Sequence, residues 1–283
     1  MTGSPVVSEF ESIIAQEPVD EVFITLSGDK YDHLIDTIVH LCEEQGIIVR
    51  LRTDIFNLKI ARWQVDELDG IRIVTISSGP PDGWPLLAKR LLDICGSAAL
   101  LLAMAPIFGI VALLIKLDST GPVFFRQERV GLNKRRFRVF KFRTMVDGAE
   151  KQQQMLESLN EAAGPVFKIK ADPRITRIGK FLRRYSIDEF PQLLNVLKGE
   201  MSFVGPRPLP VRDVERIDAR WHKRRFSVKP GVTCLWQVNG RSDVSFNEWV
   251  RMDLEYIDQW SLGLDMKILL RTIPVVLKGA GAY

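Results

Sequence analysis

Hydrophobic and polar positions follow three different patterns along the chain, and the first part, residues 19–78, combines short apolar runs with one helical pattern. The runs Glu21–Leu26, Ile47–Arg52 and Ile71–Ile76 predict strands. Between the first two, apolar residues recur at helical spacing over Tyr31–Gln45, which predicts an amphipathic helix. Strands that alternate with a helix are typical of α/β proteins with a parallel sheet, so we predict a small parallel α/β unit here.

The turn after the first predicted strand argues against a dinucleotide site in this unit. Its residues read Ser27-Gly28-Asp29-Lys30, without the G-x-G-x-x-G pattern that cradles a pyrophosphate. We therefore interpret the unit as an accessory module that contacts a partner or regulates the rest of the chain, and a homodimer formed through it is left open. Gly and Pro residues at 78–83 then break the pattern as a linker does, which places the module at residues 1–83.

A long uncharged segment dominates the second part of the chain, residues 84–120. No charged residue occurs from Ile94 to Ile115, and an apolar run above about 18 residues is a candidate for crossing a membrane. Pro106 lies near its centre, where a proline removes a helical hydrogen bond and clashes with the preceding turn. Each arm is then about 18 Å long, too short for the ~30 Å hydrocarbon core. We predict a re-entrant hairpin that bends at Pro106 and leaves both polar ends on one side; a straight spanning helix and a buried core helix are the alternatives.

Basic residues gather directly after this segment and favour the cytoplasmic face of a membrane. They are Arg126, Arg129, Lys134, Arg135, Arg136, Arg138, Lys141 and Arg143. Lys and Arg next to a membrane segment tend to stay on the cytoplasmic side, where they attract anionic head groups. The third part, residues 121–283, combines turn signals with short helical patterns, and we predict a mainly helical α+β domain.

The composition narrows the class of protein. Hydrophobic residues make up 46% and charged residues 26% of the 283 positions, the balance of a folded protein rather than a disordered chain. A mean hydropathy of +0.02 is too low for a protein with many membrane spans. The three cysteines form no C-x-x-C pair and indicate no zinc site. The three histidines occur in no H-E-x-x-H or G-x-S-x-G context, which argues against a histidine-dependent hydrolase.

Two adjacent acids, Asp188 and Glu189, are the strongest candidates for chemistry. Ser186 to Glu189 has the S-x-x-E spacing of a helix capping box, and Gly199 could end the same helix. The simplest interpretation is that both acids cap this helix, whose macrodipole favours their ionised forms. An ionised carboxylate there, with Arg183 just upstream, could also be a nucleophile toward phosphorus, while its neighbour could hold Mg²⁺ together with substrate phosphates.

Other basic residues fit the binding of phosphate. Lys141 and Arg143 stand in a Lys-Phe-Arg-Thr-Met sequence, and prolines on both sides of Arg207 restrict the backbone around its guanidinium. A planar guanidinium suits bidentate contacts with phosphate. Nucleic acid is the competing polyanion, but the chain has no zinc finger, helix-turn-helix or RNP-type aromatic pattern, so we expect no nucleic-acid partner.

A series of short motifs runs in order through the second and third parts. They are Lys89-Arg90 with Leu92-Asp93, Gly121–Gln127 (GPVFFRQ), Lys141–Met145 (KFRTM), Ser186–Glu189 (SIDE), Asn195–Pro208 (NVLKGEMSFVGPRP), Lys229–Thr233 (KPGVT) and Gln237–Arg241 (QVNGR). On these motifs, residues from about 86 to 283 resemble the bacterial sugar transferases, the monotopic polyprenyl-phosphate hexose-1-phosphate transferases, also called phosphoglycosyl transferases.

The resemblance implies a two-step transfer of a phosphosugar at the bacterial inner membrane, with the catalytic domain in the cytoplasm. Asp188 would attack the sugar-bearing phosphate of a UDP-sugar and release UMP, and undecaprenyl phosphate would then accept the phosphosugar. The product would begin the assembly of exopolysaccharide, capsule or O-antigen. Glu189, together with Asp188, would bind Mg²⁺. The positions that would contact phosphate are Lys141, Arg143, Arg183, Arg207 and Arg241.

Two features depart from the family pattern. Several members bend the hairpin at Ser-Pro, but the pair here is Ala105-Pro106, so no serine hydroxyl can satisfy the backbone at the bend. Longer members place several transmembrane helices before the α/β unit, and we expect this chain to be a truncated or naturally shortened form of them. Glucose or galactose is the expected sugar. The alternative function is a catalytically inactive, membrane-attached scaffold that binds polyanions within a polysaccharide assembly complex.

Overall fold

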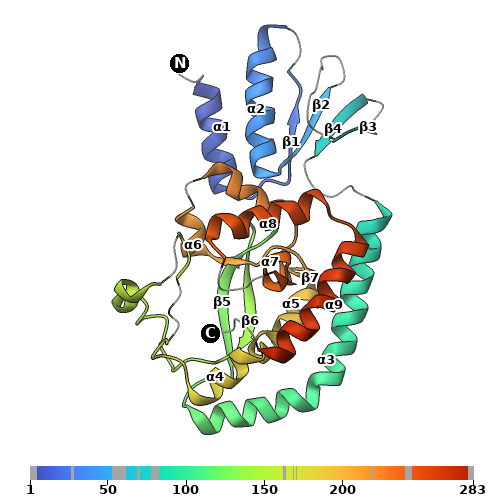
Figure 1. Ribbon diagram of the computed structural model, residues 1–283. Coiled ribbons are helices and arrows are strands. Elements are labelled where there is room, and N and C mark those ends of the chain that lie inside the picture. The colour runs from blue at the N-terminus through green and yellow to red at the C-terminus, as the bar shows by residue number, and fades with distance from the viewer. Residues whose placement is uncertain are drawn as a thin grey trace.

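The computed structural model shows an N-terminal module standing on a larger body that carries the candidate site (Figure 1). The structure describes residues 5–26, 29–52, 62–68, 71–77, 83–161, 164–167, 169, 171–217, 219–239 and 244–279.

The N-terminal module packs two helices against one face of a four-stranded sheet (Figure 1). The apolar stripe predicted on its central helix is confirmed, because the side chains of Ile35, Ile38 and Val39 are buried in the module's core. Gly46 ends that helix in the left-handed conformation, with φ of 69°. The elements are α1 (Pro5–Gln16), β1 (Glu21–Ile24), η1 (Asp29–Tyr31), α2 (Asp32–Gln45), β2 (Ile48–Arg52), β3 (Arg62–Leu68) and β4 (Ile71–Ser77).

The prediction of a parallel sheet is correct for one strand pair and wrong for the others. The strand order is β1-β2-β4-β3, with β1 and β2 parallel, whereas β4 runs antiparallel to both β2 and β3. The reason is a hairpin: Leu68 of β3 pairs with Ile71 of β4, and the two residues between them in the sequence, Asp69-Gly70, form a dipeptide typical of tight hairpin turns. This signal was overlooked, as were helix α1 and strand β3.

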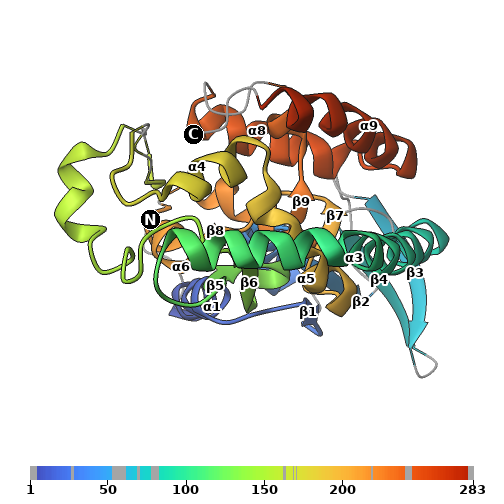
Figure 2. The same cartoon turned by 90° about the horizontal axis from the view of Figure 1, so that it is seen from below.

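The uncharged segment forms α3 (Trp84–Asp118), a single 35-residue helix with Pro106 inside it. Its ribbon runs in one direction through the first half and turns sharply into another direction in the second half (Figure 1, Figure 2). The helix therefore bends without being interrupted, as helices that contain a proline commonly do. The predicted separation into two helical arms is corrected to one bent helix.

Both ends of α3 are fastened to the same body. In the first half, the carboxylate of Asp93 accepts a hydrogen bond from the amide of Phe203 at 3.0 Å. At the other end, the Asp118 carboxylate accepts from the amide of Ile178, also at 3.0 Å. Apolar contacts add to the second attachment and join Val111 and Ile115 to Phe142 and Leu182.

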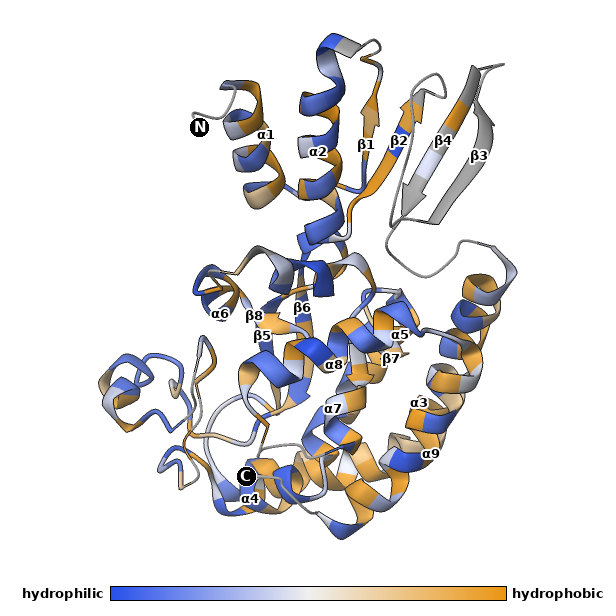
Figure 3. Cartoon of the chain, turned by 45° about the horizontal axis from the view of Figure 1, so that its top comes forward, coloured by the Kyte–Doolittle hydropathy of each residue, from blue (hydrophilic) through white to orange (hydrophobic). Residues whose placement is uncertain are grey.

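The surface of α3 remains largely uncovered, and Figure 3 shows hydrophobic residues along the helix. Among the described residues, α3 is the one helix long and apolar enough to cross a membrane, and only 11% of its most apolar stretch is buried. A core helix of a soluble domain would be mostly buried, so this alternative is excluded. Large exposed side chains include Leu91, Leu92, Leu102, Ile110, Leu113 and Leu117.

The remaining elements form a mixed domain of short helices and two small sheets. Strands β5 and β6 pair antiparallel, β8 joins the other edge of β5, and β7 pairs with β9 in parallel. The predicted mixture of helices and strands is confirmed. The elements are β5 (Phe124–Val130), η2 (Leu132–Lys134), β6 (Arg136–Phe142), η3 (Gln154–Leu159), α4 (Arg177–Arg184), η4 (Ile187–Gln192), α5 (Leu193–Lys198), β7 (Ser202–Val204), β8 (Leu209–Pro210), α6 (Val211–Glu215), η5 (Arg220–Ser227), β9 (Gly231–Thr233), α7 (Leu235–Val238), α8 (Phe246–Asp258) and α9 (Leu262–Lys278).

Much of the basic stretch after α3 faces other parts of the protein instead of forming one exposed patch. Arg135 pairs with Asp20, and Lys134 donates to the Gln45 side chain, so both hold the N-terminal module. Arg126 lies over the ring of Phe140, 5.1 Å from its centroid. These contacts show that part of the basic stretch also serves attachments within the chain, whereas Arg126 and Arg135 keep exposed side chains and their expected place at the membrane surface remains a prediction.

Candidate active site

The two candidate acids lie on a single 3₁₀ turn, η4, and not at the start of a regular α-helix. Ser186, which precedes the turn, has φ of 55° and makes no side-chain capping bond, so the predicted capping box is wrong. A non-glycine residue in the left-handed region costs about 1 kcal/mol or more, and such strain gathers at functional sites. Because the carboxylate of Glu189 does not return to Ser186, it is available for other partners.

The chain after the acids is held rigidly. A new helix, α5, starts at Leu193, and Gly199 ends it in the left-handed conformation as predicted, with φ of 88°. Asn195 on this helix is fully buried and ties it to β6, because its carbonyl oxygen accepts from the amide of Phe140 at 3.1 Å and its amide donates to the carbonyl of Arg138 at 2.8 Å. The strand that carries Lys141 is thereby fixed beside the turn that carries Asp188.

Glu189 is clamped by two cations that lie far away in the sequence. Its Oε1 accepts from Lys141 Nζ at 2.6 Å and from Arg207 Nη2 at 2.5 Å, while its Oε2 accepts from Arg207 Nη1 at 3.2 Å. Burial opposes ionisation, but Arg207 and Lys141 outweigh it and hold the pKa of Glu189 well below its usual range. The structure thus brings three of the predicted site residues together around one ionised carboxylate.

Asp188 has the opposite environment. Its side chain is buried, and among the described residues none forms a hydrogen bond or ion pair with its carboxylate. Burial raises the pKa of Asp188 to about 6, with Glu189 adding to the rise and Lys141, Arg183 and Arg207 opposing it. A carboxylate that is not engaged in hydrogen bonds, but is surrounded by cations, retains its lone pairs for attack on an electrophile.

Arg183 adds a third positive charge near Asp188. It lies in the last turn of α4, a helix that Thr176 caps by accepting from the amide of Gly179 at 3.0 Å. Its Nε donates to Thr144 Oγ1 at 2.9 Å, which orients the guanidinium, and its charge lowers the pKa of Asp188. Thr144 is a positioning residue that the sequence analysis did not single out, although it belongs to the KFRTM motif.

Arg143 is not brought to this cluster. Its guanidinium donates to the carbonyls of Thr120 and Ser119, at 2.6 and 2.8 Å, and to the Ser119 hydroxyl at 2.9 Å. These are the residues directly after α3, so Arg143 fastens the end of the apolar helix. The last predicted phosphate contact, Arg241, lies outside the described residues.

The geometry is an open carboxylate surrounded by cations, next to an apolar helix, and the comparison with known proteins agrees with it. A family model described as "Bacterial sugar transferase" matches residues 84–279. The chain belongs to the bacterial sugar transferase family.

Curated proteins similar to this chain are named as sugar transferases. The chain is 42% identical over 271 residues to "Galactosyl transferase CpsE" of Streptococcus agalactiae, which covers 93% of this chain and 59% of that protein. It is 36% identical over 246 residues to "UDP-glucose:undecaprenyl-phosphate glucose-1-phosphate transferase" of Escherichia coli, covering 84% of this chain and 51% of the relative. The chain therefore spans little more than half the length of these two relatives.

A shorter relative matches a smaller share of the chain. "Exopolysaccharide production protein ExoY" of Sinorhizobium fredii is 39% identical over 203 residues, which cover 70% of this chain and 88% of that protein. Most of that relative therefore matches 70% of this chain.

Arg129, on β5, is a second residue, after Thr144, whose place near the site the sequence analysis did not predict. Its Nη1 donates to the carbonyl of Pro208 at 2.6 Å, and burial lowers its pKa to about 10. The loop it holds passes extremely close to the segment that precedes β9, because a Cβ on Gly205 would lie 2.4 Å from the carbonyl oxygen of Lys229. Only glycine fits at Gly205. This close approach restricts the position of the backbone that leads through Pro206 to Arg207.

The residues present allow a test of the expected Mg²⁺. Among the described residues, no three His, Cys, Asp or Glu side chains gather as a metal site. Mg²⁺ is, however, commonly held by one or two carboxylates together with substrate phosphates. Glu189 Oε2, whose contact with Arg207 is the longer one at 3.2 Å, and the neighbouring Asp188 fit that mode. A metal that arrives with a diphosphate is compatible with this site, whereas a site built from protein ligands alone is not formed by the described residues.

Proposed function

We propose that the protein transfers hexose-1-phosphate from a UDP-sugar, with glucose or galactose as the sugar, to undecaprenyl phosphate and releases UMP. The observation that carries the proposal is the contrast at η4: a buried Asp188 carboxylate that none of the described residues hydrogen-bonds, beside a Glu189 that two cations hold ionised. The names of the relatives support the class of donor and acceptor. The reaction would be the first membrane step of exopolysaccharide, capsule or O-antigen synthesis.

The first step forms a covalent intermediate on Asp188. A carboxylate oxygen of Asp188 attacks the phosphorus that carries the sugar, and the bond from that phosphorus to the bridging oxygen breaks. The bridging oxygen leaves with UMP, and an aspartyl phosphosugar remains. Splitting one difficult transfer into two easier displacements is the general advantage of a nucleophilic residue.

The second step regenerates the enzyme. A terminal oxygen of undecaprenyl phosphate attacks the same phosphorus, the bond between that phosphorus and Asp188 breaks, and polyprenyl-diphosphate-sugar is released. The Asp188 carboxylate returns to its starting state, so no external oxidant or base is consumed. Arg183 would stay beside the carboxylate through both displacements and would offset the charge of the phosphoryl oxygens.

The clamp on Glu189 provides a ready set of donors for the diphosphate. Lys141 and Arg207 both end on one carboxylate, with side chains that are 16% and 25% exposed, so neither is sealed from an incoming anion. Preorganised cations aimed at developing negative charge are commonly the largest contribution to such catalysis. Mg²⁺ held by Glu189 and Asp188 with substrate oxygens would neutralise the diphosphate and the leaving UMP.

The attachment of α3 supports a membrane placement with both ends on the cytoplasmic side of the inner membrane. The Asp93 and Asp118 contacts tie the two ends of the helix to one body, which a straight helix with ends on opposite sides could not achieve. Met266, Leu270, Ile273 and Leu277 form an exposed apolar stripe on α9, whose start is joined to α3 by the Lys89–Asp265 ion pair. We propose that α3 enters one leaflet while this stripe lies at the same surface.

The experiment that separates the enzyme from an inactive scaffold is release of UMP by detergent- or nanodisc-held protein given undecaprenyl phosphate and a panel of UDP-sugars. Asp188→Asn should abolish release, because the amide keeps the size and removes the nucleophilic charge. Asp93→Asn is the matched control: this aspartate is also buried, and an amide oxygen can still accept from Ser202 and Phe203. No release from the parent protein with any donor would favour the scaffold.

A further inference from the structure

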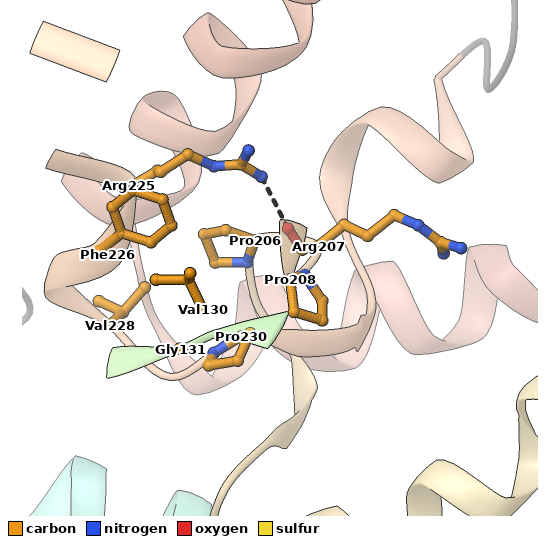
Figure 4. Close-up of a pocket in the computed structure, with 9 residues that line it drawn as sticks. All are labelled: Val130, Gly131, Pro206, Arg207, Pro208, Arg225, Phe226, Val228 and Pro230. Atoms are coloured by element: carbon orange, nitrogen blue, oxygen red, sulfur yellow. Dashed lines mark hydrogen bonds between the residues drawn. The ribbon is translucent and has the colours of Figure 1, made fainter. Parts of the chain in front are cut away.

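Arg207 makes contacts in two directions. Its guanidinium reaches Glu189, while its backbone carbonyl faces a small pocket where Arg225 donates to it (Figure 4). Figure 4 shows the Arg207 side chain pointing away from Arg225, with Pro206 and Pro208 on either side of the carbonyl. Because proline fixes φ at both neighbours, holding this one carbonyl restricts the direction in which the Arg207 side chain leaves the backbone.

The group that holds the carbonyl is buried and fixed in turn. The side chains of Arg225, on η5, and Asp253, on α8, are each only 1% exposed. A single nitrogen of Arg225, Nη2, lies 2.7 Å from Asp253 Oδ2 and 2.8 Å from the Arg207 carbonyl oxygen. The guanidinium also lies over Trp249, with its carbon 5.1 Å from the ring centroid. The ion pair, the ring and the carbonyl together leave this guanidinium little freedom.

Stability alone is a weak explanation for this pair. A buried ion pair commonly contributes no more than well-packed apolar residues of similar size. Among the described residues, Arg225 Nε and Nη1 and both Asp253 carboxylate oxygens have no hydrogen-bond partner, so the contact between the two side chains is one of charge. The pair therefore leaves buried polar atoms without hydrogen bonds, which weakens it as a source of stability. It does, however, hold the carbonyl of Arg207 in place. The next carbonyl along, that of Pro208, is held from another element by Arg129 at 2.6 Å.

We propose that Arg225, fixed by Asp253, is a positioning residue that aims Arg207 at Glu189 and the substrate phosphates. The proposal deepens the phosphoglycosyl transfer proposed above and rests on it. Arg225 itself does not touch the substrate in this account; it acts through the backbone of Arg207.

The test is a double-mutant cycle in UMP release, with folded protein verified by circular dichroism. Arg225→Met with Asp253→Leu removes both charges together, so no unpaired buried charge is left to unfold the domain. We expect turnover to fall about ten-fold in this pair variant. In an Arg207→Ala background the same pair change should have almost no effect, because no side chain is left to position. An equal fold-loss in both backgrounds, or none in either, would overturn the proposal.

A matched control and a second measurement keep the positioning role distinct from the proposed reaction. Arg224→Met alters the neighbouring residue of η5, whose guanidinium pairs with Asp258 of α8, and should not reproduce the Arg207-dependent loss. Hydrogen–deuterium exchange of the peptide that covers residues 203–210 should speed up in the pair variant but not in Arg224→Met, whatever the substrate. If exchange is faster in the pair variant but the parent protein releases no UMP, the proposed transferase reaction is refuted and the positioning of Arg207 is not. If exchange is unchanged in the pair variant, the positioning role is refuted.

Discussion

Asp188 and Glu189 are neighbours with nearly equal burial, 8% and 9% exposed, yet only the Glu189 carboxylate is bound by cationic side chains among the described residues. Lys141 and Arg207 bind Glu189 and keep its pKa well below the usual range, while Asp188, without such bonds, has a pKa raised to about 6 by burial. Two titratable groups with divergent pKa values in one site commonly have different roles. On this contrast we propose that Glu189 organises the cations and that Asp188 is the nucleophile.

The raised pKa of Asp188 predicts an acid limb in the pH profile. The ionised carboxylate is the reactive form, so lowering the pH through about 6 protonates it and slows UMP release, by about ten-fold per pH unit below that value. The measurement is the rate of UMP release in a single turnover, with a UDP-sugar and no lipid acceptor, as a function of pH. A rate that stays level down to about pH 4 would show that Asp188 ionises in the normal range or is not the nucleophile.

Replacement of Glu189 by Gln should reduce turnover by about ten-fold or more, because Lys141 and Arg207 lose the charge that organises them. Raised Mg²⁺ should restore part of the activity if this carboxylate also holds the metal, and a chelator should abolish the activity of the parent protein. Glu157→Gln, at a carboxylate that pairs with Arg212 and Arg216 away from Asp188, is the control. Parental activity of Glu189→Gln at limiting Mg²⁺ would reject the metal role.

Arg207→Lys tests whether the planar fork matters. The structure shows two nitrogens of Arg207 on two oxygens of Glu189, and lysine cannot reproduce that pairing. We expect a loss of about ten-fold in kcat/KM, equivalent to about 1.4 kcal/mol in transition-state stabilisation. Arg212→Lys is the control for a general loss of guanidinium groups. Equal activity of the Arg207→Lys variant and the parent would mean that Arg207 supplies only positive potential.

Arg143→Lys should act on stability before it acts on chemistry. The guanidinium makes three hydrogen bonds to the residues that follow α3, so its loss should lower the unfolding free energy by about 1–3 kcal/mol. The KM for the UDP-sugar should stay within about two-fold of the parent value. A large rise in KM without a fall in Tm would return Arg143 to the phosphate-binding role that its motif predicted.

Pro106→Leu tests the bend of α3. Removing the proline restores an unbroken ladder of helical hydrogen bonds in an apolar helix long enough to span a bilayer. Tags before Ala88 and after Gly121 should both be protected in sealed cells with the parent protein. In the variant the N-terminal tag should become accessible in part, and turnover should fall, because a re-entrant α3 would set the height of Asp188 above the membrane. Tags on opposite sides in the parent protein would contradict the re-entrant placement.

The sequence predicted those features that a short local pattern specifies without ambiguity. The periodicity of α2 and the glycine that ends α5 were predicted correctly. The uncharged run was expected to form two helical arms, and the structure has one bent helix instead. The same type of reasoning failed at Ser186, because S-x-x-E spacing does not distinguish a helix start from a strained 3₁₀ turn. A true capping box occurs at Ser245 and Glu248, where it was not predicted.

Long-range contacts decided the roles of the basic residues, and no local pattern encodes them. Lys141 and Arg143 are two positions apart in one motif, yet Lys141 reaches Glu189 and Arg143 reaches the end of α3. Arg129 looked like one more charge in a membrane-facing stretch but holds the carbonyl of Pro208 inside the protein. In each case the partner is set by which strands pair and which loops cross, so the role became visible only in the folded chain.

The proposed attack by Asp188 is best tested by the mass of the intact protein after incubation with a UDP-sugar and Mg²⁺ but without a lipid acceptor. We expect an added phosphohexose that peptide mapping places on Asp188, that disappears when undecaprenyl phosphate is added, and that never forms in Asp188→Asn. Continuous UMP release that depends on the lipid acceptor, with no adduct on the parent protein and with undiminished turnover in Asp188→Asn, would contradict a nucleophilic Asp188.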